Sequence, residues 1–161
     1  CDVMLTKTII DIVYHGILGI FATLGFAVWF NVPRNTLARV VVVGCLGYIT
    51  RRALIQLGHT PAMSCFWAAL CIGLVGYHFA RQKDEPRVIF TIPGIIPMVP
   101  GIPAYESLVS FFAGNVSQGV ENAVRAAMIT GALAAGLTAA RTVTMRRLFE
   151  QPFWYRIRRS H

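Results

Sequence analysis

Six ionisable side chains lie within or beside apolar stretches of this chain, and they are the first candidates for chemistry. They are Asp11, His15, Arg51, Arg52, Glu106 and Arg125. A charge at the centre of a membrane costs about 2.5–3.5 kcal/mol on insertion scales, so such residues often mark a pathway for a solute or a proton. The 161 residues hold no HExxH, GxSxG or P-loop pattern. We therefore predict a protein that is not an enzyme and has no catalytic residue, cofactor or metal site.

Arg51 is the preferred partner for a carboxylate. Neighbouring residues on a helix point about 100° apart, so at most one of Arg51 and Arg52 can face a central cavity. Arg51 follows Gly44 by seven residues and Gly47 by four, and it shares their helix face. The alternative is that both side chains snorkel to the membrane surface. We expect Arg51 to bind substrate and keep Arg52 as a secondary candidate.

Residues 92–105 read IPGIIPMVPGIPAY, an apolar run that cannot form one continuous helix. Its helix-breaking residues are Pro93, Gly94, Pro97, Pro100, Gly101 and Pro103. Proline has no amide hydrogen, so an unbroken helix would leave four carbonyls without partners, those of Ile89, Pro93, Ile96 and Val99. Inside a membrane such a break is tolerated only where protein or water covers it, and broken helices build the substrate sites of many transporters. Free amides there suit a carboxylate, and free carbonyls suit an ammonium group or a cation.

The other ionisable residues have a structural and a functional interpretation. Glu106 would stabilise a helix N-terminus if the helix restarts two residues earlier, and otherwise it could couple transport to protons. Arg125 follows Glu121 by four residues, which favours a surface ion pair and leaves Arg125 a secondary binding candidate. Asp11 and His15 are also four apart, and they could satisfy each other or relay a proton.

Composition and segment lengths predict an all-α integral membrane protein with a single transmembrane domain over residues 1–161. Hydrophobic residues make up 55% and charged residues 14%, against about 25% charged in soluble domains. A span needs about 20 apolar residues. Five segments qualify, at about 5–30, 35–57, 61–80, 88–112 and 119–142, the fourth broken by the proline cluster, before a basic tail at 143–161. Cys1 stands where an initiator Met is expected, so we expect residues upstream of it.

Basic residues predict the orientation. The net charge of +8 sits mainly at the ends of the apolar segments, which favours a topological role over nucleic-acid binding. With the C-terminus in the cytoplasm, eleven of the 15 Lys and Arg residues lie inside, namely Arg34, Arg39, Arg81, Lys83, Arg87, Arg141, Arg146, Arg147, Arg156, Arg158 and Arg159. We therefore expect the N-terminus outside, and an odd number of spans suggests that a partner supplies a missing half.

The fifth segment carries two rows of small residues. One row is Ala127, Gly131, Ala135 and Ala139, and the other is Ala132, Gly136 and Ala140. Small residues let helices approach closely in lipid. Either row could form a subunit interface or pack against another span of this chain.

Two motifs resemble the ThrE-type threonine/serine exporter family. Residues 30–33 read FNVP, and residues 96–105 read IPMVPGIPAY, which contains P-x-x-P-G-x-x-x-Y. The resemblance runs from about Gly25 to the fifth segment and is closest to the short, five-span subunit of two-component members. Pro103 is additional to the usual pattern.

The resemblance implies site residues and a function. The substrate-binding positions would be Arg51, Pro97, Pro100, Gly101 and Tyr105, with Asn31 of FNVP a secondary candidate. The fused form of the family is associated with threonine and serine. The two-component form is associated with succinate and requires a second, larger membrane subunit. We expect a multi-pass exporter subunit of the bacterial inner membrane, and the alternative is an accessory subunit that stabilises its partner without transporting.

Overall fold

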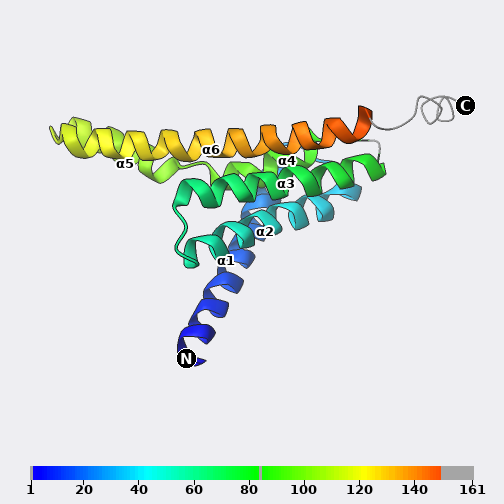
Figure 1. Ribbon diagram of the computed structural model, residues 1–161, viewed down its shortest axis with the longest axis horizontal. Coiled ribbons are helices and arrows are strands. Elements are labelled where there is room, and N and C mark those ends of the chain that lie inside the picture. The colour runs from blue at the N-terminus through cyan, green and yellow to red at the C-terminus, as the bar shows by residue number, and fades with distance from the viewer. Residues whose placement is uncertain (1, 84, 150–161) are drawn as a thin grey trace, which may run out of the picture.

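The structure is a computed structural model that describes residues 2–83 and 85–149 (Figure 1). It contains α1 (Asp2–Trp29), α2 (Arg34–Gln56), α3 (Pro61–Lys83), α4 (Val88–Ile95), the 3-10 helix η1 (Ile96–Met98), α5 (Gly101–Phe112) and α6 (Val116–Phe149). No strand occurs in these two ranges. The predicted boundaries hold to within a few residues except for the last helix, which continues to Phe149 where a tail was predicted from 143. Residues 150–161 of that tail lie outside the described residues.

The predicted number of spans is confirmed only in part. Among the described residues, three helices are long and apolar enough to cross a membrane, at Ile10–Trp29, Pro61–Gln82 and Val116–Met145. The pair Val88–Met98 and Gly101–Phe112, bent by 44°, makes a fourth if it counts as one span. The second predicted span, α2, does not qualify: it is 23 residues long but carries four arginines, which reduce its hydropathy.

A helix-ending motif explains the FNVP sequence between α1 and α2. Asn31 has a φ of 53°, in the left-handed region that asparagine tolerates. The N–H of Asn31 donates to the Val28 carbonyl at 3.0 Å, and the N–H of Val32 donates to the Ala27 carbonyl at 3.0 Å. This pattern is a Schellman motif, which satisfies carbonyls at the end of a helix. Asn31 therefore ends α1, and binding of substrate by Asn31 stays a prediction.

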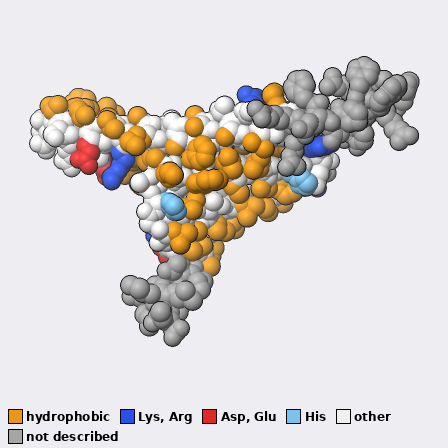
Figure 2. Space-filling view, in the orientation of Figure 1, with side chains coloured by type: hydrophobic (Ala, Val, Ile, Leu, Met, Phe, Trp, Pro, Cys, Tyr) orange, Lys and Arg blue, Asp and Glu red, His pale blue; other side chains and the backbone are white. Residues whose placement is uncertain are grey.

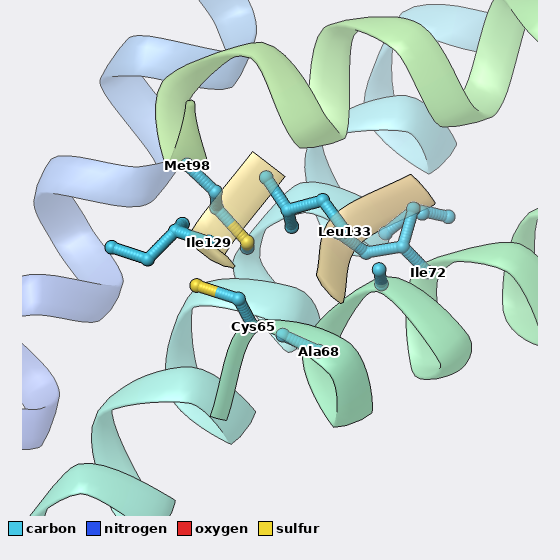
Figure 3. Close-up of a cluster of buried hydrophobic side chains, with 8 residues drawn as sticks. Cys65, Ala68, Ile72, Met98, Ile129 and Leu133 are labelled. Carbon is cyan, nitrogen blue, oxygen red and sulfur yellow. The ribbon is translucent and has the colours of Figure 1, made fainter. Parts of the chain in front are cut away.

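The main core lies where α3 meets α2, η1 and α6 (Figure 3). Its buried members are Val43, Cys65, Ala68, Ala69, Ile72, Met98, Ile129 and Leu133. The cluster thus joins the proline-rich break, through Met98, to α2, α3 and α6. Apolar side chains also cover much of the visible outer face (Figure 2), and Trp29 is 79% exposed and Leu57 75% exposed. A lipid environment accounts for so much uncovered apolar surface.

The two small-residue rows of α6 have different surroundings. The row that contains Gly136 and Ala140 faces α3, where a Cβ added to Gly136 would collide with the carbonyl oxygen of Phe66. A Cβ added to Gly73 of α3 would lie 2.5 Å from the Cβ of Ala140. In the other row a Cβ on Gly131 meets no atom of the described chain within 4 Å. Internal packing therefore accounts for the row that contains Gly136 but not for the row that contains Gly131.

α5 and the start of α6 form a hairpin that extends beyond the ends of α2 and α3 (Figure 1). The hydroxyl of Ser107 donates to the Gly119 carbonyl at 2.8 Å and ties the two helices together. The outer side of α5 is uncovered, with Ile102 74% exposed and Phe112 90% exposed. The 34 residues of α6 extend about 51 Å, which exceeds the roughly 30 Å of a bilayer core.

Candidate functional site

The proline cluster breaks the chain within the bundle. α4 passes through Pro93 and ends at Ile95, η1 adds one 3-10 turn, and extended backbone follows at Val99 (φ −59°, ψ 133°). α5 then starts at Gly101 with Pro103 in its first turn, where a proline costs no hydrogen bond. The side chains of Pro93, Met98 and Pro100 are buried. The break is therefore an internal element and not a surface loop.

Three carbonyls at the break, those of Ile96, Pro97 and Val99, have hydrogen-bond partners. The N–H of Val99 donates to the Ile96 carbonyl at 3.1 Å, and the N–H of Gly101 donates to the Val99 carbonyl at 2.8 Å. An unbroken helix would leave these two carbonyls without partners, whereas the 3-10 turn and the tight turn of the observed break satisfy both. The Pro97 carbonyl accepts a hydrogen bond from the hydroxyl of Tyr48 at 3.1 Å.

Tyr48 is a residue that sequence reasoning missed. It lies on α2, and its ring packs so closely on α1 that a Cβ on Gly19 would lie 2.8 Å from its Cγ. A tyrosine hydroxyl in an apolar helix needs a hydrogen-bond partner. That requirement is a signal in the sequence, but the partner is identified only by the fold.

Arg51 and Arg52 point to different neighbours, as the helix geometry predicts. The Nε of Arg51 donates to the Sγ of Cys65 on α3 at 3.2 Å. Cys65 is fully buried in the same cluster as Met98, and both side chains are drawn in Figure 3. The Arg51 guanidinium therefore lies at the edge of the core that contains the break, and it has no carboxylate partner within 4 Å among the described residues.

Arg52 belongs to a polar cluster between α1 and α2. Its Nε pairs with Asp11, whose Oδ2 also accepts a bond from the Gln56 side chain at 2.6 Å. His15 lies 2.9 Å from the main-chain oxygen of Asp11 and 3.4 Å from its carboxylate. The predicted Asp11–His15 pair exists, but Arg52 is the closer partner of the carboxylate because α2 crosses α1 there. This ion pair favours a structural interpretation of Arg52, and binding of substrate by Arg52 stays a prediction.

Tyr105 and Glu106 lie beyond the break on α5. Tyr105 is 68% exposed, and a Cβ added to Gly101 would meet no atom of another described element within 4 Å. No hydrogen bond in the described residues joins Arg51 to Tyr105. Glu106 is exposed, and the first turn of α5 contains no acidic residue, because the helix starts earlier than predicted. The capping interpretation of Glu106 is therefore wrong.

Arg125 and Glu121 line a cavity of about 250 Å³ beside the start of α3. Their side chains form no ion pair within 4 Å in the described part of the chain, so the predicted surface pair is wrong. Asn31 lines a smaller cavity of about 180 Å³ that also contacts Pro93 of the broken helix. The structure thus brings Arg51 to the break, whereas it leaves Arg125 and Tyr105 on the outer face.

Comparison with known proteins identifies relatives. An uncharacterized protein of Haemophilus influenzae is 28% identical over 141 residues, which cover 83% of this chain and 48% of that protein. The chain therefore spans about half the length of this relative. No solved structure matches it. A family model described as threonine/serine exporter, ThrE, matches residues 15–143, which include Arg51 and the whole break. On this match over most of its length, the chain belongs to the ThrE family of threonine/serine exporters.

Proposed function

We propose that this protein is one subunit of an exporter for small solutes that carry a carboxylate, and that it works with a second, larger membrane subunit of the same family. Threonine and serine, or dicarboxylates such as succinate, fit this class. The observation that carries the proposal is the position of a basic side chain beside a buried helix break. Arg51 contacts Cys65, and Cys65 packs in the same core as Met98 of η1.

The chemistry of this arrangement suits a carboxylate. An arginine presents N–H groups in a planar fork that matches two carboxylate oxygens. The backbone around Pro97, Pro100 and Gly101 is irregular, and it lies beside the protein core that contains Met98. In the proposed complex Tyr105, exposed on this chain alone, would complete the site once a partner covers α5. The uncharged residues at the break have a different role: they set the path of the backbone beside the substrate. They are Pro97, Pro100 and Gly101.

Chain length and charge support the rest of the proposal. The relative from Haemophilus influenzae is about twice as long, so a second half of similar size accompanies this half there. The Thr36 hydroxyl at the start of α2 donates to the Glu85 carboxylate beyond α3 at 2.9 Å. The start of α2, the end of α3 and the end of α6 therefore share one end of the bundle, on the right in Figure 1. That end holds most of the basic residues, which supports a cytoplasmic C-terminus and an inner-membrane location.

The rate of export by the Arg51→Met variant tests the proposal. Loss of a charge-assisted hydrogen bond costs about 1.5–3 kcal/mol, so export of labelled threonine or succinate should fall about tenfold to a hundredfold. The matched control is Arg34→Gln, an exposed arginine at the start of the same helix. Both variants should co-purify with the partner subunit as the unmodified protein does.

The alternative is an accessory subunit that stabilises its partner without contacting substrate. It predicts unchanged export per assembled complex for both Arg51→Met and Tyr105→Phe. Lower export together with loss of the partner would also favour the accessory role, because assembly would then be the property that changed. Lower export with an intact complex supports a direct role for Arg51.

A further inference from the structure

A cavity of about 360 Å³ lies between α3, α4 and α6, away from the site described above. Four side chains supply its polar lining, namely Arg87, Thr91, Thr138 and Arg141. Val88 and Leu137 are among the apolar residues beside them. Two arginines more than 50 residues apart in sequence thus share one cavity, although neither is part of the proposed substrate site.

The guanidinium groups of Arg87 and Arg141 have no carboxylate partner within 4 Å in residues 2–83 and 85–149. The guanidinium of Arg87 lies over the ring of Tyr77, 4.2 Å from its centroid. Stacking occupies the flat face of the guanidinium and leaves its N–H groups, which lie in the plane, free to donate. The cavity therefore has a positive potential and a preoriented donor.

The hydroxyl of Tyr77 is a further group without a partner among the described residues. Its oxygen is buried and has no hydrogen-bond partner in the part of the chain that the structure describes. A buried polar atom without a partner is costly, so a ligand or a water normally satisfies it. This hydroxyl belongs to the ring that Arg87 covers. The groups in and beside the cavity can therefore donate hydrogen bonds, and a ligand that supplies acceptor oxygens would satisfy them.

The charged groups of the cavity gather at one end, and the lining of α6 becomes uncharged away from Arg141. Along α6 the lining runs from Arg141 through Thr138 and Leu137 to Ala134. The seven helical steps from Ala134 to Arg141 extend about 10 Å along the helix axis. Arg87 lies at the same end as Arg141, just after the loop that follows α3. An elongated molecule with an anionic head and an apolar body matches this gradient better than a compact hydrophilic anion does.

We propose that this cavity binds the phosphate headgroup of an anionic phospholipid from the surrounding membrane, with Arg87 and Arg141 as its ligands. Basic pockets between membrane helices hold anionic lipid headgroups in this way. Arg141, Thr138 and Val88 are exposed at the perimeter of the bundle, so a lipid can enter from the side. The proposal does not depend on which solute the protein exports.

Lipid retention tests the proposal. The full chain is purified in mild detergent, and native mass spectrometry measures binding of added phosphatidylglycerol and phosphatidylcholine. Each basic residue near an anionic surface contributes about a fivefold factor in affinity, so Arg87→Gln with Arg141→Gln should weaken phosphatidylglycerol binding about thirtyfold. Binding of phosphatidylcholine should stay unchanged. Arg141→Gln alone, which removes an exposed side chain, should weaken binding about fivefold and serves if the double variant does not fold.

Arg34→Gln is the control, because it removes one exposed arginine from the same end of the bundle without touching the cavity. An equal loss in this control would overturn the proposal, and so would equal binding of the two lipids by the unmodified protein. Inorganic phosphate and succinate form the last arm of the test. If either displaces phosphatidylglycerol at millimolar concentration from the unmodified protein, the cavity is a solute site and the lipid assignment is wrong.

Discussion

The hydroxyl of Tyr48 donates to the carbonyl oxygen of Pro97 at 3.1 Å, and this bond joins α2 to the centre of the broken helix. In a continuous helix the Pro97 carbonyl would bond the N–H of Gly101, which instead donates to Val99. Tyr48 therefore replaces a missing backbone donor at a half-buried position. The break is held in place by a side chain from another helix and not only by its own prolines.

Tyr48→Phe should destabilise the protein while preserving its fold. A carbonyl that loses its partner in a poorly hydrated site costs about 1–3 kcal/mol. Thermal unfolding in detergent should show a lower midpoint, and export should fall because the break is less constrained. Tyr14→Phe is the control, since Tyr14 is 59% exposed on α1. Equal midpoints for the two variants would mean that the Tyr48–Pro97 bond contributes nothing measurable.

Gly136→Ala should destabilise the packing of α6 against α3. The added methyl would collide with the carbonyl oxygen of Phe66 and lie 2.9 Å from the Cβ of Ala69, and backbone atoms cannot move aside as a flexible side chain can. We expect a loss of about 1–3 kcal/mol, typical of overpacking. The matched variant Gly131→Ala, five residues earlier, meets no atom within 4 Å and should leave the unfolding midpoint of the isolated subunit unchanged. A similar loss for both variants would contradict the assigned rotation of α6.

Arg52 and Asp11 should be energetically coupled. Arg52→Gln removes the closest partner of the Asp11 carboxylate and leaves that negative charge on the apolar helix α1 without an ion pair to Arg52. Asp11→Asn removes the charge itself, so the double variant should lose less stability than the two single losses added together. Unfolding midpoints of the four proteins in detergent give the comparison. Strictly additive losses would show that the ion pair contributes no coupling.

Glu106→Gln tests proton coupling, which remains a prediction for this residue. If Glu106 relays protons, substrate transport in reconstituted vesicles should lose its dependence on an imposed pH gradient. Glu121→Gln is the control, because Glu121 is also an exposed glutamate on the projecting hairpin. Retention of the full gradient dependence in Glu106→Gln would exclude Glu106 as the coupling residue.

Local chemistry in the sequence determined the helices and the position of the break. Apolar runs bounded by FNVP, by residues 58–60 and by the charged loop after α3 marked the helix ends to within a few residues. Proline has no amide hydrogen, so the interruption near residues 97–100 follows from composition. The different directions of the Arg51 and Arg52 side chains also follow from the 100° step between neighbouring residues of a helix. These features depend on residues close together in the chain.

Only the tertiary structure decided which surfaces meet. Tyr48 with Pro97, Arg52 with Asp11, and Arg87 with Arg141 are separated by 41 to 54 residues and belong to different parts of the bundle. Their pairing depends on how each helix is rotated and crossed, and periodicity alone does not specify rotation relative to a neighbour in a chain that is apolar on most sides. Packing of the small residues Gly73 and Gly136 sets that rotation, because backbones approach closely only where no side chain intervenes.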